Sequence, residues 1–474
     1  MIALYESVEH LDRRAVETFG MSEELLMEHA ALAMKRVITE RFETANVLIV
    51  AGSGNNGADG LALARLLLTA GGFEVSVFMP LGAASELAAR QLERIRALGV
   101  RETEAIEPCD ILVDALFGSG FNRKLDDWGV KLISQMDMCD AFKIACDVPS
   151  GVSKDGNYDT CARMDITVTM GAPKLALFND RIKDKAGDIV VADLGLPREA
   201  YMGESDAFLL EPQDWMLPVR ENQDSHKGSY GHLATVMGEK PGAAVLCALA
   251  ALRFGAGLST VIAREHHLNV PFDLMQSRRP QAGTTAVALG MGLGEAFIDD
   301  ELLEMIDDLP VALDADALAR PMVLKLLQKK HPLVLTPHPK EFAGLLKLCD
   351  LGSHTVEEVQ ENRLELARKF SEAFPEAVLL LKGANVIIAH QNRRYLNPHG
   401  SPVLAKGGSG DVLTGLIGSL LAQGYGPLEA AVTASLAHTE AAARYEGADF
   451  SMLPTDLIAV LSGLGLPAEA PHPA

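Results

Sequence analysis

The sequence predicts an α/β protein of two domains, and three observations support this. The chain has 474 residues, which is more than a single hydrophobic core usually holds. Short apolar runs alternate with segments of helical periodicity along most of it. A polar, turn-rich stretch from Met216 to Gly231 interrupts the alternation, which then resumes. We therefore expect one domain at residues 1–215 and a second at residues 216–474.

The first domain has the pattern of a parallel sheet. Its strand-like runs are Val47–Val50, Val75–Met79, Ile111–Leu116 and Ile144–Val148. Helical periodicity separates these runs, as it does where crossover helices join parallel strands.

The second domain shows another alternation of the same kind. Strands are expected at residues 232–237, 259–262, 286–289, 311–313, 333–335, 378–381 and 386–388. Helices are expected at residues 242–254, 411–422 and 428–445. The Pro/Ala-rich tail from Leu466 to Ala474 is expected to be disordered.

The composition argues against several classes of protein. A net charge of −22 disfavours a nucleic-acid or membrane-surface partner, because such partners need a basic footprint. The sequence has no stretch of about 20 apolar residues, so we expect no membrane span, and the N-terminal segment MIALYESVEHLDRR carries charges where a signal peptide is apolar. The six cysteines lack C-x-x-C spacing, which favours reduced core thiols over disulfides or zinc. We expect a cytoplasmic protein.

A glycine-rich turn follows the first strand, in the segment VLIVAGSGNNGADGLALARLL that begins at Val47. Gly52, Gly54 and Gly57 fit the pattern G-x-G-x-x-G of dinucleotide-binding turns. The ordinary site also needs an acid at the end of the next strand to bind the ribose. That strand ends at Met79 instead, which argues against the ordinary site.

Three strand ends in the first half carry an acid next to a glycine-bearing loop, namely Asp59, Asp114 and Asp147. Because the carboxyl ends of parallel strands line one crevice, we expect these acids to converge. A single acid of this kind is often only a helix N-cap, but three at equivalent places indicate a site. Asn56, Asp114 and Ser150 offer only oxygen ligands, which suits a hard cation better than zinc.

The second half contains a glycine-rich helix start, AKGGSGDVLTGLIGSLLAQG, at residues 405–424. Backbone amides there can stabilise the oxyanions of a transferring phosphoryl group, and Asp411 is placed to take a proton from an attacking hydroxyl. The alternative is a capped core helix whose glycines allow close packing. The sequence has no G-x-x-x-x-G-K-[ST] motif, so phosphoryl chemistry here is not of the P-loop type.

Other residues of the second half belong to the same candidate site. They are Lys382 and Gly383 at a strand end, Gly290, Gly292 and Gly294 in a turn, and His338 and Glu341 at a helix start. His338 and Glu341 lack a third ligand at suitable spacing, which argues against a metal centre there.

These motifs together resemble those of the bifunctional NAD(P)H-hydrate repair enzymes, in which an NAD(P)HX epimerase precedes an ADP-dependent NAD(P)HX dehydratase. The resemblance covers nearly everything from Leu11 to about Leu464. It rests on LLMEHAALA, GSGNNGADG, DALFGSGFNR and DVPSGV in the first half and on SHKGSYG, ALRFGAGLSTV, TPHPKEF and GGSGDVLTG in the second. It implies a Rossmann-like three-layer sandwich followed by a ribokinase-like α/β domain.

The resemblance also implies the residues of each site. In the first domain the hydrated nucleotide would be held by Asn55, Asn56, Gly57, Ala58, Asp59, Gly118, Ser119, Gly120, Phe121, Asn122, Arg123 and Lys124, with Asp147 at the hydrated ring. Potassium would be bound by Asn56, Asp114 and Ser150. In the second domain Gly294, His338 and Asp411 would face the hydrated nicotinamide. The adenine nucleotide would be held by Lys382, Gly383, Ala384, Asn385, Val386 and Gly410.

The implied chemistry uses one carboxylate in each domain. Asp411 would deprotonate the hydroxyl of the S hydrate, which attacks the β-phosphate of ADP; elimination of phosphate then restores NAD(P)H and leaves AMP. Asp147 would serve as acid and base in the exchange of R and S hydrates. The implied cofactors are K⁺, and Mg²⁺ with the co-substrate ADP. The substrates would be NADHX and NADPHX, and the assembly a homo-oligomer, by resemblance a homotetramer.

Four positions depart from the usual family pattern. Ala58 and Met291 stand where glycine and proline are frequent, Val386 stands where threonine is frequent, and Lys406 stands where a small residue is common. The departures at Val386 and Lys406 bear on whether the nucleotide is ADP or ATP more than on the reaction itself.

Two other classes of function remain open from the sequence. A ribokinase-type kinase of a small molecule would leave a stable phosphorylated product. A non-enzymatic first domain would bind a metabolite or partner protein without exchanging the two hydrates.

Overall fold

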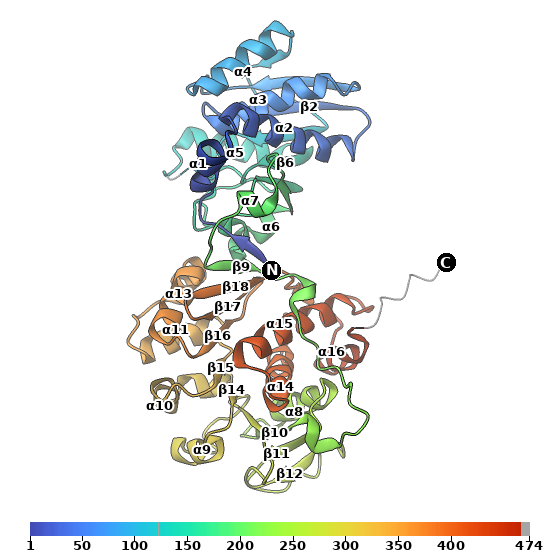
Figure 1. Cartoon of the computed structure of the whole chain (residues 1–474), viewed down its shortest axis with the longest axis vertical. Coiled ribbons are helices and arrows are strands. Elements are labelled where there is room, and N and C mark those ends of the chain that lie inside the picture. The colour runs from blue at the N-terminus through green and yellow to red at the C-terminus, as the bar shows by residue number, and fades with distance from the viewer. Residues whose placement is uncertain (122, 466–474) are drawn as a thin grey trace, which may run out of the picture. The chain divides into compact units, whose positions relative to one another are not determined.

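A computed structural model describes residues 1–121 and 123–465. The chain forms two compact units, one from Ala3 to Ala207 and the other from Phe208 onward together with Met1 and Ile2 (Figure 1). Strand β1 (Ile2–Leu4) lies at this division. Across the described residues, every helix is too short or too polar to span a lipid bilayer.

The N-terminal unit contains a parallel sheet of seven strands in the order β4-β3-β2-β5-β6-β7-β8. Its strands are β2 (Ala45–Ala51), β3 (Phe73–Phe78), β4 (Arg101–Thr103), β5 (Ile111–Ala115), β6 (Phe142–Cys146), β7 (Ile166–Met170) and β8 (Asp188–Ala192). The order reverses between β2 and β5, and this is where open α/β sheets form a crevice at the carboxyl ends of their strands.

Helices cover both faces of this sheet, so the unit has three layers. The helices are α1 (Glu9–Phe19), α2 (Glu23–Thr39), α3 (Asn55–Leu68), α4 (Glu86–Ala97), α5 (Asp127–Met138), α6 (Lys183–Ala186) and α7 (Arg198–Tyr201). Along β2, Val47 and Ile49 pack into the core shared with α2, α3 and α4. Val50 packs on the opposite face with Leu132 and Ile133 of α5, as the two-residue period of a strand requires.

The sheet of the C-terminal unit runs in the order β9-β18-β17-β16-β15-β14-β13-β10-β11-β12. Its strands are β9 (Ala207–Leu209), β10 (His232–Val236), β11 (Leu258–Ile262), β12 (Met275–Ser277), β13 (Ala286–Leu289), β14 (Val311–Leu313), β15 (Leu333–Leu335), β16 (Val378–Leu381), β17 (Val386–His390) and β18 (Arg393–Asn397). The strands from β16 to β12 are parallel, whereas β17 and β18 run antiparallel. The order of the parallel strands reverses between β10 and β13.

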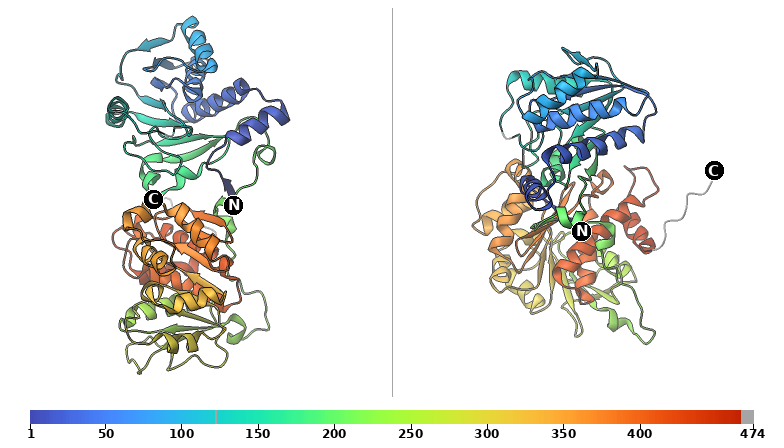
Figure 2. Two further views of the ribbon diagram at one scale, coloured as in Figure 1. Left: turned by 90° about the vertical axis from the view of Figure 1, so that its left-hand side faces the viewer. Right: turned by 45° about the horizontal axis from the view of Figure 1, so that its top comes forward.

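Helices again lie on both faces of the sheet (Figure 2). They are α8 (Pro241–Arg253), α9 (Asp299–Ile306), α10 (Met322–Gln328), α11 (Pro339–Leu348), α12 (Val356–Glu361), α13 (Arg363–Ala373), α14 (Ser409–Ala422), α15 (Pro427–Ala443) and α16 (Pro454–Val460). Helix α14 is buried along nearly its whole length and packs between α8, α15 and the sheet. An almost entirely apolar helix of this kind belongs in a core.

The strands expected from the sequence are present, with small shifts at their ends. The strand expected to reach Val148 ends at Cys146, because Asp147 has a positive φ of 75° and leaves the extended conformation. Strands β1, β4, β7, β8, β9, β12 and β18 were not expected. Three of the six cysteines are only half-buried, so the expectation of core thiols holds for Cys146, Cys161 and Cys247 alone. The expected disordered tail lies outside the described residues.

The segment before Met216 packs with the C-terminal unit, which places the contact boundary earlier than residue 215. The ring of Phe208 stacks on Tyr395 at 5.7 Å, and the amide of Leu210 donates to the carbonyl of Leu396 at 2.8 Å. Independent folding of the two halves stays a prediction.

A fragment of residues 208–474 should therefore be more stable than one of residues 216–474. The shorter fragment loses β9 and the buried side chain of Leu210, which is worth about 2 kcal/mol in the free energy of unfolding. Thermal unfolding of both fragments tests this. The longer fragment with Leu210→Ala should have a melting temperature between those of the two fragments. Equal melting temperatures would contradict the assignment of residues 208–215 to this unit.

Candidate functional site

The glycines from the end of β2 to the first turn of α3 allow backbone segments to approach closely. A Cβ on Gly52 would lie 1.9 Å from the carbonyl oxygen of Leu116, and a Cβ on Gly57 would lie 1.9 Å from that of Gly52. Gly54 has open space around it. The turn thus packs against the end of β5, on the other side of the point where the strand order reverses.

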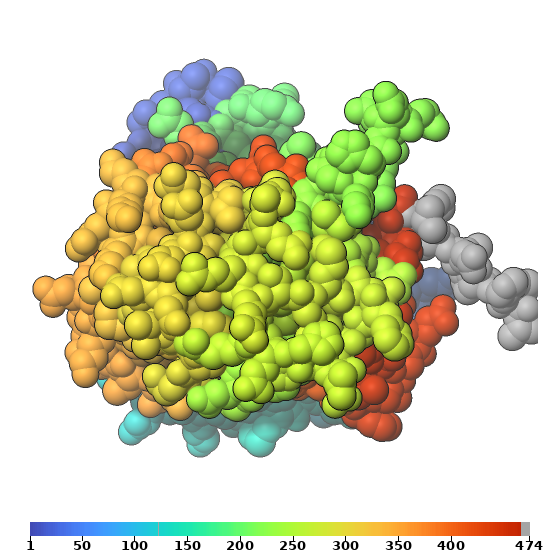
Figure 3. Space-filling model, turned by 90° about the horizontal axis from the view of Figure 1, so that it is seen from below, coloured from blue at the N-terminus to red at the C-terminus, as the bar shows by residue number. Residues whose placement is uncertain are grey.

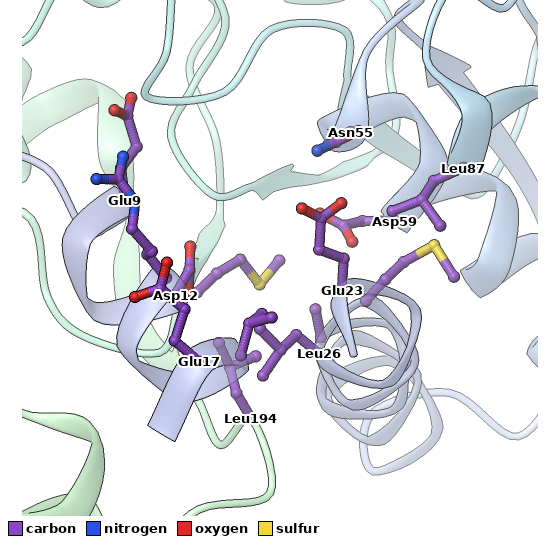
Figure 4. Close-up of a pocket in the computed structure, with 14 residues that line it drawn as sticks. Glu9, Asp12, Glu17, Glu23, Leu26, Asn55, Asp59, Leu87 and Leu194 are labelled. Atoms are coloured by element: carbon purple, nitrogen blue, oxygen red, sulfur yellow. The ribbon is translucent and has the colours of Figure 1, made fainter. Parts of the chain in front are cut away.

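A pocket of about 510 Å³ opens beside this turn (Figure 4). Asn55 and Asp59 of α3 line it together with residues of α1 and α2. Among the other predicted residues, Gly57 and Ala58 are buried, and Ala58 belongs to the hydrophobic core. The methyl group that distinguishes Ala58 from glycine therefore contacts the core.

Asp147 is held by a buried lysine. Its Oδ1 lies 2.5 Å from Nζ of Lys174, a side chain with only 1% of its surface exposed. Its Oδ2 accepts a hydrogen bond from the amide of Ser119 at 2.8 Å. Burial raises the pKa of Asp147, but the ion pair and the hydrogen bonds outweigh it, so this pKa lies below its ordinary value. Asp147 is therefore ionised at neutral pH.

Asn56, Asp114 and Ser150 all contact the loop that follows β5. The carboxylate of Asp114 accepts from the amide of Leu116 at 3.2 Å, and from the hydroxyl and amide of Ser150 at 2.6 and 2.8 Å. The hydroxyl of Ser150 accepts from the amide of Phe117 at 2.9 Å. The side chain of Asn56 lies beside Gly118. The structure thus brings the three predicted cation ligands to one loop.

Two features of Asn56 and Asp114 favour the binding of a cation. The oxygen and nitrogen of the Asn56 amide are buried, and neither has a hydrogen-bond partner within the described residues. Burial raises the pKa of Asp114 to about 6, although its hydrogen bonds act in the opposite direction. A hard cation would satisfy the amide oxygen and stabilise the carboxylate.

The rest of the predicted loop begins at this site and extends away from it. Ser119 contacts Asp147, whereas Arg123 and Lys124 are exposed. The ring of Phe121 stacks on Phe117 at 4.6 Å. Asn122 lies outside the described residues.

In the C-terminal unit, the glycine turn after β13 lies where the strand order reverses. Gly290 has a φ of 118°, and a Cβ there would lie 1.8 Å from the carbonyl oxygen of Asp314. The amide of Gly294 donates to Asp316 at 2.9 Å, and a Cβ on Gly294 would collide with the carboxyl group of Glu239. The turn therefore contacts the segments that follow both β10 and β14.

An ion pair with a buried carboxylate lies beside the start of α14. Nζ of Lys382 is 2.7 Å from Oδ1 of Asp314, and Thr414 donates to Oδ2 of the same carboxylate at 3.2 Å. A Cβ on Gly410 would lie 3.5 Å from this Nζ and 3.7 Å from Oδ2. The structure thus brings Lys382 and Gly410 together, as predicted.

Asp411 follows in the first turn of α14 and is half-buried. Burial and the charge of Asp314 raise its pKa to about 6, with Lys382 acting in the opposite direction. A carboxylate with a pKa close to neutral is suited to accept a proton.

His338 and Glu341 cap helix α11 reciprocally. Nδ1 of His338 accepts from the amide of Glu341 at 3.3 Å, and Oε2 of Glu341 accepts from the amide of His338 at 2.8 Å. Oε2 of Glu341 also lies 3.8 Å from Nζ of Lys382. Glu341 thus connects the cap of α11, which includes His338, to Lys382.

The predicted nucleotide loop connects β16 to β17. Gly383 and Ala384 are exposed, whereas Asn385 and Val386 are buried. Lys406, before α14, donates to the carbonyl of Phe450 at 2.6 Å.

The sequence did not indicate Asp12, Lys174, Asp314 and Arg363. Asp12 lines the N-terminal pocket, and Lys174 and Asp314 form the ion pairs just described. Arg363 is buried and donates to the carbonyls of Leu381 and Lys382, which fixes that strand end. Their partners are distant in sequence, so no local pattern points to them.

A second pocket of about 470 Å³ lies in the C-terminal unit, lined by Arg264, Arg279, Phe297 and Glu301 among others. Figure 3 shows one face of this unit, on which the segments from about residue 250 to 330 are coloured yellow-green to yellow. Arg264 is already paired with Glu301 at 2.7 Å and lies over the ring of Phe297. None of the predicted site residues lines this pocket.

Comparison with known proteins gives matches over both units. A family described as YjeF-related protein N-terminus matches residues 23–176, and one described as NAD(P)H-hydrate dehydratase matches residues 234–462. A bifunctional NAD(P)H-hydrate repair enzyme of Helicobacter pylori is 42% identical over 471 residues, which covers 97% of this chain and 99% of the relative. The enzyme of the same description from Coxiella burnetii is 33% identical over 498 residues, covering 96% and 98%.

Among solved structures, the ADP/ATP-dependent NAD(P)H-hydrate dehydratase of Bacillus subtilis co-crystallised with ATP and Mg²⁺ is 30% identical. The match covers 51% of this chain and 91% of that one, with a TM-score of 0.44.

The glycine turn of the N-terminal unit gives a direct test of its packing. Gly57→Ala should lower the free energy of unfolding by about 1–3 kcal/mol, because its Cβ collides with a backbone carbonyl that cannot move independently. Gly54→Ser serves as the control, since its side chain enters open space at the N-cap of α3. Denaturant unfolding measures the stability of both variants. Equal free energies of unfolding would contradict this packing.

Proposed function

The chain belongs to the family of bifunctional NAD(P)H-hydrate repair enzymes, and we propose that it exchanges R and S NAD(P)HX in the N-terminal unit and dehydrates S-NAD(P)HX with ADP in the C-terminal unit. One observation supports this most directly. Each unit carries its own carboxylate and lysine group at the carboxyl ends of its parallel strands. Two sites of this kind in one chain match two reactions.

For the dehydration, Asp411 accepts the proton of the hydrate hydroxyl, whose oxygen attacks the β-phosphate of ADP and displaces AMP. The charge of Lys382 and the amides at the start of α14 stabilise the phosphoryl oxygens. Phosphate then leaves the ring together with a proton from the adjacent carbon, which restores the double bond of NAD(P)H. Mg²⁺ would enter with the nucleotide, whose phosphate oxygens are suitable ligands.

For the exchange, Asp147 acts next to the hydrated ring, and K⁺ would be held by Asn56, Asp114 and Ser150. The unpartnered amide of Asn56 and the raised pKa of Asp114 fit a monovalent cation at this place. Such an ion would supply a fixed positive charge beside the loop after β5. The homotetramer implied by the resemblance and the cytoplasmic location expected from the composition remain predictions.

One assay tests the function and separates it from its main alternative. The purified protein is given a mixture of R and S hydrates with ADP or with ATP. Repair releases inorganic phosphate and restores the near-ultraviolet absorbance of NADH, whereas a ribokinase-type kinase leaves a stable phosphorylated product and no such absorbance.

Asp411→Asn should abolish the dehydration without unfolding the chain. The variant keeps the shape of the side chain but loses the base, which costs roughly 100- to 10,000-fold in rate. In the wild type, dehydration should decline as the pH falls through about 6, because only the ionised carboxylate accepts a proton. Unchanged thermal unfolding of the variant is the folding control, and its exchange of R and S should persist. A dehydration rate within tenfold of wild type would show that Asp411 is not the base.

Asp114→Ala should remove the dependence of R/S exchange on potassium, together with most of its rate. The substitution removes the one formal charge among the three proposed ligands. The exchange rate is measured in potassium and in sodium at equal ionic strength. Equal rates of the wild type in both salts, with Asp114→Ala unchanged, would exclude the assignment.

A further inference from the structure

The N-terminal site contains more carboxyl groups than its buried lysine can pair. Asp12 and Asp59 line the pocket, and Asp147 lies next to Met170, which also lines it. The ammonium of Lys174 has three N–H groups, and three oxygens surround it: Asp147 at 2.5 Å, the hydroxyl of Thr169 at 3.1 Å and the carbonyl of Met170 at 3.2 Å. Lys174 therefore has no donor left for another carboxyl group.

The two remaining carboxyl groups differ in their partners. Asp12 accepts a hydrogen bond from the hydroxyl of Tyr201 at 2.7 Å. Asp59 has no hydrogen bond or ion pair with another side chain in the part of the chain that the structure describes, and its carboxyl group points into the pocket (Figure 4).

The charged groups around Asp59 are mostly negative. Glu9, Asp12, Arg13 and Glu17 line the pocket from α1, Glu23 lines it from α2, and Asp147 with Lys174 lies beyond the ends of β6 and β7. Burial, and then the charges of Asp147 and Asp12, raise the pKa of Asp59 well above its ordinary value. Two carboxyl groups of one site thus have pKa values displaced in opposite directions, which is the pattern of an acid and a base.

We propose that Asp59 is the proton donor and Asp147 the proton acceptor in the exchange of R and S hydrates, and that Lys174 is the positioning residue that fixes this division. The inference rests on the proposed epimerase function and adds to it the direction of proton transfer. In the reverse exchange the two carboxyl groups act in reverse.

The proposed reaction balances without a further reactant. The hydroxyl carbon of the hydrate is bonded to the ring nitrogen. Asp59 gives its proton to the hydroxyl oxygen, the carbon–oxygen bond breaks, and the nitrogen lone pair forms a carbon–nitrogen double bond as water leaves. Water then adds to the opposite face, Asp147 takes its extra proton, and the electron pair returns to nitrogen. One proton has moved from Asp59 to Asp147, and solvent returns it.

Asp59→Asn tests the donor, because the amide has nearly the same shape and no acidic proton. We expect kcat for exchange to fall at least about 100-fold with little change in KM. In the wild type, exchange should decline as the pH rises through the raised pKa of Asp59, because its protonated form is lost; the variant should lack this decline. A rise in KM alone, or a kcat within tenfold of wild type, would make Asp59 only a contact residue and overturn the proposal.

Lys174→Met and Lys174→Arg test the positioning role. The methionine variant should lose kcat with KM nearly retained, and the arginine variant should recover part of it because the charge is restored. If Lys174→Arg has no higher kcat than Lys174→Met, or if both variants keep full activity, the positioning role of Lys174 is overturned. If the methionine variant does not fold, the kcat of Asp59→Asn and its pH profile decide the proposal.

Controls distinguish a failure of this inference from a failure of the proposed epimerase function. Glu74→Gln changes an exposed acid on β3, outside the pocket, and should leave the exchange unchanged. A wild-type protein that dehydrates hydrates but does not exchange them would refute the epimerase function itself. A wild type that exchanges them while Asp59→Asn does so equally well would refute only the donor assignment.

Discussion

Parallel strands of one sheet end at the same edge, and this geometric constraint determines where both sites form. In each unit the strand order reverses once among the parallel strands, between β2 and β5 and between β10 and β13. The loops that follow these neighbouring strands turn to opposite faces and leave a crevice between them. The glycines at both places allow one loop to contact the next backbone, so the crevice is bounded by main chain that cannot easily shift.

Each site contains a lysine, buried in the N-terminal unit and partly exposed in the C-terminal unit, and the two lysines have different electrostatic effects. Lys174 pairs with Asp147 itself and keeps that carboxylate ionised. Lys382 pairs with Asp314, the neighbour of Asp411, and the charge of Asp314 still contributes to the raised pKa of Asp411. The choice of partner therefore sets whether the pKa of the proposed base lies below or above its ordinary value. Similar residues thus give Asp411 a higher affinity for a proton than Asp147.

The sequence predicts the layers and the loops of this protein better than its buried polar contacts. Apolar runs such as Val47–Val50 and Val311–Leu313 identify strands, because burial on both faces leaves little choice of residue. Strand β18 was missed, since Arg393–Asn397 carries two arginines and an asparagine among its five residues. Glycine turns and acids at strand ends indicate the sites. Lys174 was missed because its pairing with Asp147 depends on how β6 and β7 are arranged, which no local pattern encodes.

The backbone of Asp147 has a consequence for how this site tolerates mutation. Its positive φ of 75° costs roughly 1–3 kcal/mol for a residue with a side chain, and glycine would remove that strain. Glycine would also leave the buried ammonium of Lys174 without its counterion, at a cost of about 3–5 kcal/mol. The second cost exceeds the first, so the ion pair makes the strained residue the more stable choice. The two positions are therefore epistatic: Asp147→Gly is tolerated only after Lys174 has been replaced by an uncharged residue.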